Sequence, residues 1–221
     1  MSQVTLYNYF RSSTSYRVRI ALNLKNIEYT YSPVHLLNNG GEQFIPSYKA
    51  LNPMSEVPTL EHDGLVIGQS VAIIEYLEEQ FPNPNLFPRD SQKRAKIRQF
   101  CENINSFLHP LSNLKVLKYL EDNHGYDQRQ KEVWINHWYQ KGLGALEAWL
   151  QKNMGRYSFA DQVTVADCFL VPLVFTSERF NVDLSPFKNI MSVNSRCLEL
   201  EAFRNAHPFR QVDTPVELRI P

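Results

Sequence analysis

The sequence predicts an α/β domain over residues 1–81, a proline-rich linker over 82–88 and an all-helical domain over 89–221. Three observations support this division. Strand-like and helix-like segments alternate before residue 81, and an Asp63-Gly64 pair between two short apolar runs marks a hairpin. The linker then places three prolines where neither a helix interior nor a central strand would accept them, and no strand pattern follows it.

The first elements form a strand, a helix and a second strand. Residues Val4–Tyr7 alternate at period two, and Tyr29–Val34 has the same character. Between them, Ser15–Lys25 carries apolar residues at the i, i+3, i+4 spacing of one helical face, beginning with Val18. Because the connections are tight, these elements predict a βαβ unit with parallel strands.

A hairpin and a helix follow. Thr59–His62 and Leu65–Ile67 flank the turn, and Ser70 stands where the N-cap of the next helix belongs. The order βαβ, connection, ββα is the layout of a thioredoxin-like domain. By analogy with that layout, the Val57-Pro58 peptide bond is expected to be cis.

The second half contains only helical patterns. Thr164–Phe180 is apolar nearly all round and predicts a buried helix, opened by a Thr164/Asp167 capping box and kinked or broken at Pro172. Gly142 and Gly144 are expected to weaken the middle of a long helix. Two amphipathic stripes predict further helices in this half: Ile97, Phe100, Cys101, Ile104, Leu108 and Leu111, then Trp134, Trp138, Ala145 and Trp149.

Charge and composition exclude several classes of function. Lys plus Arg and Asp plus Glu both total 23, so the net charge is zero and nonspecific binding of nucleic acid or anionic membranes is not expected. No signal peptide and no apolar run of about 18 residues are recognised. The three cysteines are widely spaced, and the histidines lack paired spacing, so neither a disulfide framework nor a metal site is expected. The sequence predicts a cytoplasmic protein.

The turn before the first helix carries the first candidate site. Residues Arg11–Tyr16 present hydroxyl groups and no thiol, at a helix N-terminus whose N–H groups attract an anion. Such a turn can donate hydrogen bonds to a thiolate brought by a cofactor and lower the pKa of that thiol. The alternative is that these residues only cap the helix, and the cluster alone favours capping.

A second candidate site begins the last helix of the first half. Gln69 and Ser70 offer a backbone N–H and a hydroxyl at a helix N-terminus, which suits a carboxylate. An ordinary N-cap explains the pair equally well. Together with the backbone of Val57, these groups fit a γ-glutamyl peptide.

The residues of the first helix resemble a known family. Ser12–Leu22 is similar to the motif SSCxWRVRIAL of zeta-class glutathione transferases, with Thr14 where the family often has Cys and Tyr16 where it has Trp. The resemblance covers essentially the whole chain. Its further segments are Ala50–Pro53, Val57–Leu60, Gln69–Glu79, Val163–Asp167 and Asp213–Arg219.

The resemblance implies a glutathione cofactor, a helical domain that closes the substrate pocket, and a homodimer. It implies that Ser13 places its hydroxyl on the cofactor sulfur, with Ser12 beside it. Arg11 and Arg179 are candidates for binding substrate carboxylates, although a surface or interdomain ion pair is the more common explanation for any single arginine. The glutathione contacts that it implies are Ser12, Ser13, Thr14, Ser15, Gln43, Val57, Gln69, Ser70, His109, Asn113, Leu114 and Lys115.

The implied activity is cis–trans isomerisation of maleylacetoacetate in tyrosine and phenylalanine breakdown. A thiolate that adds to the maleyl alkene leaves a single bond free to rotate, and its expulsion gives the trans product with glutathione unchanged. Maleylpyruvate is an alternative substrate. Further alternatives are a transferase that conjugates or dehalogenates small electrophilic acids and, ranked lower, a non-catalytic binding module. The absence of a cysteine at Thr14 weighs against activities that need a second thiol.

Overall fold

The computed structural model describes residues 3–220, and the chain divides into two compact units. One comprises Met1–Asn85 with Glu199–Pro221, and the other comprises Leu86–Leu198. The sequence-based boundaries place residues 199–221 in the helical domain, whereas the contacts place them in the first unit. Buried polar groups account for the difference, because Arg19 Nε donates to Ala206 O at 3.0 Å and Phe10 N donates to Asp213 Oδ2 at 2.9 Å.

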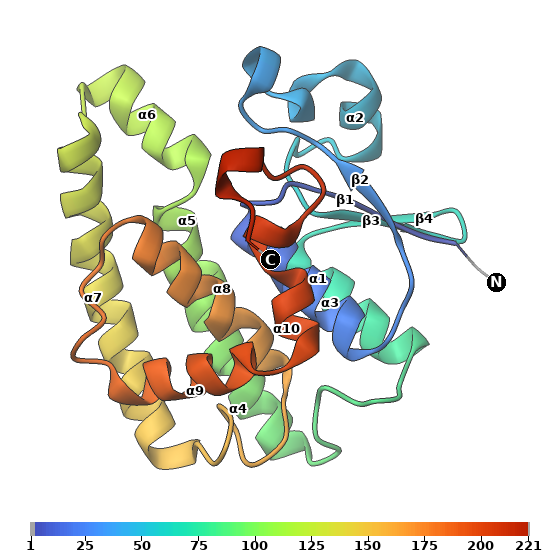
Figure 1. The fold of residues 1–221 in the computed structure, drawn as a ribbon, viewed down its shortest axis with the longest axis vertical. Helices are drawn as coiled ribbons and strands as arrows, with labels where there is room; N and C mark the ends of the chain where they lie inside the picture. Colours follow the sequence, from blue (N-terminus) through green and yellow to red (C-terminus); the bar gives the residue numbers. More distant parts are fainter. Residues whose placement is uncertain (1–2, 221) are drawn as a thin grey trace. The chain divides into compact units, whose positions relative to one another are not determined.

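The first unit is built on a four-stranded mixed sheet in the order β2-β1-β3-β4 (Figure 1). β1 pairs in parallel with β2, while β3 is antiparallel to both β1 and β4. The predicted βαβ unit and hairpin are therefore confirmed. The elements of this unit are β1 (Val4–Asn8), α1 (Ser13–Leu24), β2 (Thr30–Pro33), η1 (Asn38–Gly40), η2 (Glu42–Phe44), α2 (Pro46–Leu51), β3 (Thr59–His62), β4 (Leu65–Gly68), α3 (Ser70–Gln80), α10 (Glu201–Ala206), η4 (Pro208–Arg210) and η5 (Val216–Leu218).

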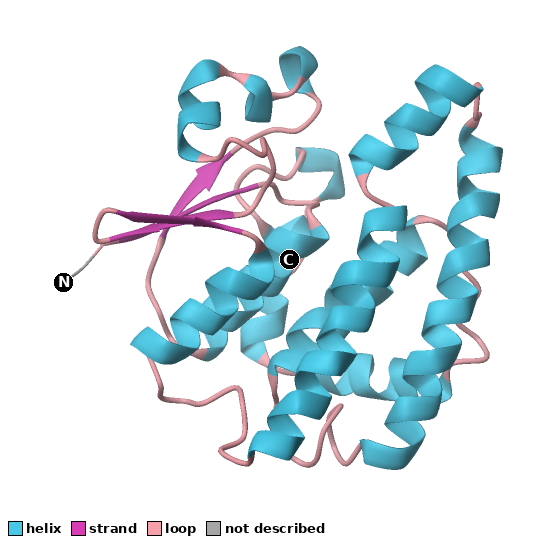
Figure 2. Cartoon of the chain, turned by 180° about the vertical axis from the view of Figure 1, so that it is seen from behind, coloured by secondary structure: helices cyan, strands magenta, loops and turns pink. Residues whose placement is uncertain are grey.

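Two local predictions in this unit are also confirmed. Asp63 and Gly64 both have positive φ, 50° and 81°, as the two-residue hairpin turn requires. The Val57-Pro58 peptide bond is cis. Helices α1 and α3 lie on one face of the sheet and α2 lies on the opposite face, which gives the layers of a thioredoxin-like domain (Figures 1 and 2).

Helix α1 differs from the expected amphipathic helix because it is buried on every side. The predicted face, beginning with Val18, is in the core, but Arg17 and Arg19 are also buried, at 1% and 0% exposure. The helix packs against α3 and α10, so the C-terminal segment covers a side that the sequence pattern assigned to solvent. The pattern of apolar residues could not indicate this, since buried guanidinium groups look polar in a sequence.

The second unit is entirely helical apart from an isolated bridge between Met154 and Ala160. Helix α8 packs against α4 and α9, and α7 packs against η3 and α9. Among residues 3–220, no helix is long and apolar enough to cross a membrane. The elements are α4 (Ser91–Glu102), η3 (Asn103–Leu108), α5 (His109–Leu111), α6 (Leu114–His124), α7 (Gln128–Asn153), α8 (Val165–Arg179) and α9 (Lys188–Leu198).

Helix α8 confirms one prediction and corrects another. Its Thr164/Asp167 capping box is present, and residues 165–177 are buried. The helix continues past Pro172 to Arg179, so the alternative of a local break is wrong. The first amphipathic stripe also runs less regularly than expected, because α4 passes into a π-helical segment, η3, before Pro110.

Helix α7 exists as predicted, and its tryptophan stripe lies beside the fully buried face. The tryptophan side chains are half-buried and Ala145 is exposed, while the core is formed by Ile135, Tyr139, Gly142, Leu143, Leu146 and Leu150. Gly142 does not interrupt the helix. A Cβ atom there would lie 2.3 Å from Leu108 Cδ2, so glycine permits the close approach of η3.

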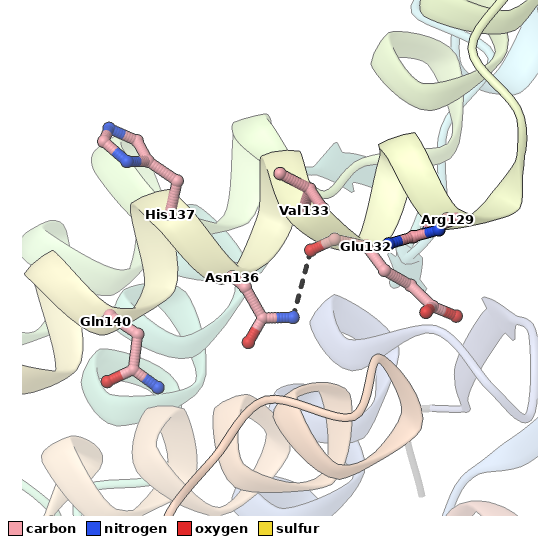
Figure 3. A pocket seen from close by; sticks show the side chains of 6 residues that line it. All are labelled: Arg129, Glu132, Val133, Asn136, His137 and Gln140. Carbon is pink, nitrogen blue, oxygen red and sulfur yellow. Dashed lines mark hydrogen bonds between the residues drawn. The ribbon is translucent and has the colours of Figure 1, made fainter.

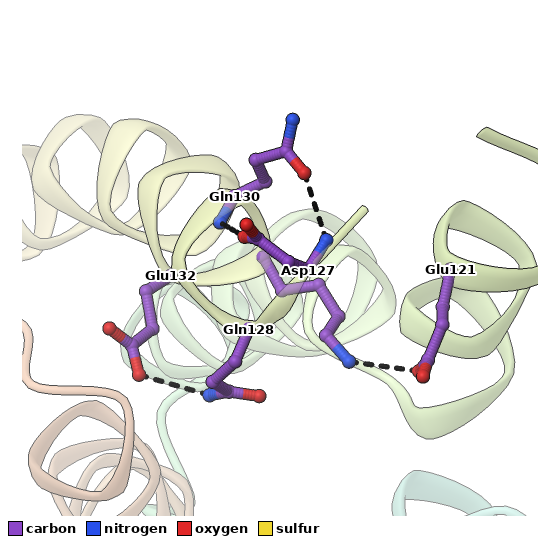
Figure 4. Close-up of polar contacts among 6 residues, drawn as sticks. Glu121, Asp127, Gln128, Gln130 and Glu132 are labelled. Carbon is purple, nitrogen blue, oxygen red and sulfur yellow. Dashed lines mark hydrogen bonds and ion pairs between the residues drawn. The ribbon is translucent and has the colours of Figure 1, made fainter. Parts of the chain in front are cut away.

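The start of α7 is fixed by side chains at the helix end (Figure 4). Asp127 accepts from Gln130 N at 2.7 Å, and Gln130 Oε1 accepts from Asp127 N at 2.8 Å, which completes a capping box. Lys131 forms an ion pair with Glu121 of α6 at 2.9 Å. These contacts fix the connection between α6 and α7.

Candidate functional site

The N-terminus of α1 is formed by the serine cluster. Ser12 is the N-cap: its extended backbone lets its hydroxyl oxygen accept from Ser15 N at 3.2 Å. Ser12 N donates to Tyr9 O at 3.0 Å, which closes the turn after β1. The capping interpretation is therefore correct for Ser12, and Ser13 occupies the first helical position, where the backbone N–H groups have no partner within the helix.

The hydroxyl of Thr14 links this turn to the cis-proline loop. Thr14 Oγ1 donates to Val57 O at 2.9 Å and lies 2.9 Å from Ser12 Oγ. A hydroxyl has one hydrogen, so Ser12 must be the donor of the second bond. With its hydrogen directed to Thr14, the Ser12 hydroxyl does not donate to a ligand sulfur in this arrangement, and the role of Ser13 toward that sulfur rests on the resemblance. That role remains a prediction.

The other predicted residues of this turn differ in accessibility. Ser15 is fully buried, so the structure does not bring its side chain to the surface of the site. Arg11 is half-buried, with its guanidinium 5.9 Å from the ring centroid of Phe10. Arg11 is thus close to Ser12 in the chain and accessible to solvent.

The backbone of Val57 is held by a buried polar network. Tyr48 donates its hydroxyl hydrogen to Glu56 O at 2.7 Å, and Asn52 Nδ2 donates to the same oxygen at 2.9 Å. Burial raises the pKa of Tyr48 to about 12, so the phenol stays protonated at neutral pH. Thr59 Oγ1 lies 2.9 Å from the Tyr48 oxygen and completes the network.

The N-terminus of α3 differs from the expectation by one residue. Gln69, not Ser70, is the N-cap, and its side chain forms no capping bond. Gln69 has φ 67° and ψ 117°, an unusual conformation for a residue with a side chain, which costs about 1–3 kcal/mol. Such strain is found most often at ligand sites, where it orients backbone groups.

Ser70 lies beside a buried positive charge. Arg17 NH1 donates to Ser70 Oγ at 3.2 Å, and Ser70 itself is 3% exposed. Since a guanidinium only donates, the Ser70 oxygen is the acceptor and its own hydrogen is available for a carboxylate. The cation and the helix N-terminus both favour an anion here. Arg17 was not among the predicted site residues, because a motif match gives no sign that an arginine is buried.

Gln43 provides a test of whether a peptide-like cofactor fits this unit. Its side chain is 5% exposed, and Nε2 donates to Leu36 O at 3.3 Å. The Oε1 atom is buried without a hydrogen-bond partner among the described residues. A Cβ at Gly41, whose φ is 104°, would lie 2.5 Å from Gln43 Nε2, so glycine permits this folded side chain. An unpaired acceptor of this kind suits the amide groups of glutathione.

The remaining predicted contacts lie in the helical unit. Asn113 is the N-cap of α6 and accepts from Lys115 N at 3.0 Å, while its Nδ2 lies 3.3 Å from His109 Nε2. Leu114 is 42% exposed. Arg179 is exposed at the end of α8, 4.5 Å from the ring centroid of Phe180. All five can meet a ligand from solvent, and their roles remain predictions.

A shallow hollow on α7 contains none of the predicted residues (Figure 3). Within it, Asn136 Nδ2 donates to Glu132 O at 3.0 Å, one turn back along the helix. These are ordinary contacts of a solvent-facing helix. The lining residues are Arg129, Glu132, Val133, Asn136, His137 and Gln140.

A thioredoxin-like sheet with hydroxyl groups at two helix N-termini, in one chain with an all-helical unit, defines the architecture of a glutathione transferase. The glutathione S-transferase N-terminal domain family matches residues 6–85, and the corresponding C-terminal domain family matches residues 105–202. Together, the two matched segments cover most of the chain.

Individual relatives narrow the assignment. Maleylacetoacetate isomerase of Rattus norvegicus is 49% identical over 97% of this chain and 96% of its own length. A holo structure of a bacterial maleyl pyruvate isomerase, a zeta-class glutathione S-transferase, is 44% identical, covers 96% of this chain and 100% of its own, and has a TM-score of 0.93. Maleylacetoacetate isomerase of Anaeromyxobacter dehalogenans with bound GSH in the active site is 40% identical, with coverages of 97% and 99% and a TM-score of 0.87. The chain belongs to the glutathione S-transferase family, in its zeta class.

Proposed function

We propose that the protein is a glutathione-dependent isomerase that converts maleylacetoacetate to fumarylacetoacetate in the breakdown of tyrosine and phenylalanine. The observation that carries the proposal is the pair of helix N-termini on one domain whose polar groups suit an anion. One has hydroxyl groups without a thiol, and the other has Ser70 beside the buried Arg17. Relatives that bear this activity in their names are similar over nearly the whole chain.

The residues of the first unit would hold glutathione. Ser70 and the N-terminus of α3 would bind its γ-glutamyl carboxylate, and the backbone of Val57 would pair with its peptide. Gln43 would accept from an amide N–H. The α1 N-terminus and Ser13 would stabilise the thiolate, since a hydroxyl donor and the helix dipole both favour the anion.

Bound glutathione supplies a nucleophilic thiol that can add to a conjugated double bond and leave again. The chain's own part is to keep that thiol ionised near neutral pH and to hold the carboxylates of the acid. Arg11 and Arg179 are the candidates for the second task, by bidentate pairing. His109 and Asn113 of the helical unit are the candidates for further contacts to glutathione.

Maleylpyruvate is the second candidate substrate, because a maleylpyruvate isomerase of a Ralstonia species is 45% identical over 95% of this chain. Steady-state assays with each acid and with a chloro-acid separate the possibilities. We expect the largest kcat/KM with maleylacetoacetate. Turnover confined to the chloro-acid, with glutathione consumed, would favour a transferase, and binding of glutathione without any turnover would favour a non-catalytic module.

We further propose that the protein is a cytoplasmic homodimer. Its three cysteines are buried as free thiols, which fits a reducing compartment. Sedimentation equilibrium gives the oligomeric state directly: twice the mass of the 25.8 kDa chain is expected, and the mass of one chain would contradict a dimer.

A further inference from the structure

The C-terminal segment contacts the turn that carries the serine cluster. Asp213 Oδ2 accepts from Phe10 N at 2.9 Å, and its Oδ1 accepts from the hydroxyl of Tyr31 on β2 at 2.5 Å. Phe10 immediately precedes Arg11 and Ser12. A carboxylate more than 200 residues away in the chain therefore binds the backbone at the entrance to α1. Both partners belong to the first unit, where the segment lies close to the start of α1 (Figure 1).

The carboxylate is presented by a rigid turn. Thr214 donates its hydroxyl hydrogen to Pro208 O at 2.7 Å, and Thr214 N donates to Gln211 O at 3.1 Å. Arg219 donates from Nε to Thr214 O and from NH2 to Val212 O, both at 3.0 Å. These bonds hold the residues on both sides of Asp213. Residues Asp213–Arg219, one of the segments that resemble the family, therefore have a structural role: they hold the Asp213 carboxylate against the turn before α1.

A buried cation binds the same turn from its other side. Arg19 NH2 donates to Phe10 O at 2.9 Å, and NH1 donates to Asn8 Oδ1 at 2.9 Å and to Tyr9 O at 3.4 Å. Tyr9 O also receives the Ser12 amide. The N–H of Phe10 is therefore bound by an anion and its C=O by a cation, which fixes the plane of the peptide groups that lead to Ser12.

We propose that Asp213 is a positioning residue that orients the Arg11–Ser13 turn for binding and ionising the glutathione thiol. The proposal rests on the proposed function of that turn. Charge-assisted bonds to backbone N–H groups are strong and directional, so loss of the carboxylate releases one side of the turn while Arg19 still holds the other. Small misplacements of reacting groups can cost about 100-fold in rate.

The test compares Asp213→Ala, Asp213→Asn and the control Asp90→Ala. Asp90 also accepts a backbone N–H, from Lys93 at 2.8 Å, but it caps α4 in the helical unit. Three quantities are measured: hydrogen exchange of the Phe10 and Ser12 amides without ligand, the dissociation constant of glutathione by calorimetry, and the pH titration of thiolate absorbance in the binary complex.

We expect Asp213→Ala to speed exchange at both amides, to weaken glutathione binding about 10- to 100-fold, and to raise the bound thiol's pKa by about one unit. Asp213→Asn retains an acceptor oxygen for Phe10 N and should restore most of the binding and the titration. Asp90→Ala should leave all three quantities unchanged. Unchanged binding and thiol titration in folded Asp213→Ala would overturn the proposal.

If Asp213→Ala does not fold, Tyr31→Phe serves as the second variant, because it removes the donor to Oδ1 and leaves Phe10 untouched. It should shift the thiol titration in the same direction by a smaller amount, and no shift would again overturn the proposal. Failure of the proposed isomerase function can be distinguished from failure of the role proposed for Asp213. Wild-type protein that forms the thiolate but isomerises neither acid would refute the isomerase while leaving the role of Asp213 intact.

Discussion

Asp167 is expected to be the residue whose loss most destabilises the helical unit. Its side chain is fully buried; Oδ1 accepts from Ser158 N at 2.9 Å, and Oδ2 accepts from Thr164 N at 2.8 Å and from Thr164 Oγ1 at 3.3 Å. Asp167→Ala leaves two buried amides without acceptors, at about 1–3 kcal/mol each. Burial raises the pKa of Asp167, so removing the carboxylate also removes a desolvation penalty. The net loss is expected to be about 3 kcal/mol.

Urea unfolding followed by tryptophan fluorescence measures this loss. All three tryptophans lie in α7, so the signal reports the helical unit. Asp90→Ala is the matched control: it removes an exposed N-cap carboxylate and should cost about 1 kcal/mol. Asp167→Asn, which keeps one acceptor oxygen, should fall between the two. A loss for Asp167→Ala no greater than that for Asp90→Ala, at unchanged m-value, would refute the reasoning.

Three further predictions concern the turn, the C-terminal segment and the packing of α7. Ser13→Ala should lower kcat/KM about 100-fold with the fold intact, whereas Ser12→Ala should mainly cost about 1 kcal/mol of stability as a lost cap; equal rates for Ser13→Ala and wild type would contradict the role given to Ser13. Burial, with Arg19 nearby, lowers the pKa of His207 from 6.5 to about 4. Between these two pH values the unfolded chain binds a proton on His207 that the folded chain does not, so the free energy of unfolding should fall as pH falls from about 6.5 to about 4. The loss is about 1–2 kcal/mol after solvent screening, and thermal unfolding of His207→Asn should lack this acid slope. Gly142→Ala should destabilise by about 1–3 kcal/mol despite alanine's better helix propensity, because its Cβ would overlap Leu108; a rise in melting temperature would contradict the packing.

Much of the fold could be predicted because its signals are local. The Asp63-Gly64 turn needs two residues that tolerate positive φ, and the Thr164/Asp167 box needs two side chains three positions apart. Each is complete within a few residues. The cis Val57-Pro58 bond was expected from the thioredoxin-like layout, and the resemblance to a family added a ligand role for the serine cluster, which local patterns alone left ambiguous with helix capping.

The remainder depended on contacts between distant residues. Arg17 and Arg19 look like surface residues in a sequence, yet both are buried. Their guanidinium groups donate to acceptors that are distant in the chain, Ser70 Oγ for Arg17 and Ala206 O for Arg19. Asp213 acquires its role only because the C-terminal segment returns to the first unit. In α7 the tryptophans mark one amphipathic stripe, whereas the smaller residues one position along, such as Ile135 and Leu150, form the fully buried face. Both stripes have helical spacing, so periodicity alone does not show which of them is buried.

The most direct test of the central claim is the ratio of fumarylacetoacetate formed to glutathione consumed, measured with purified protein and maleylacetoacetate. The account predicts many turnovers for each glutathione present and no net loss of free thiol, because the thiol is released unchanged in every cycle. Loss of one glutathione per acid converted, or no conversion by protein that binds glutathione, would contradict it.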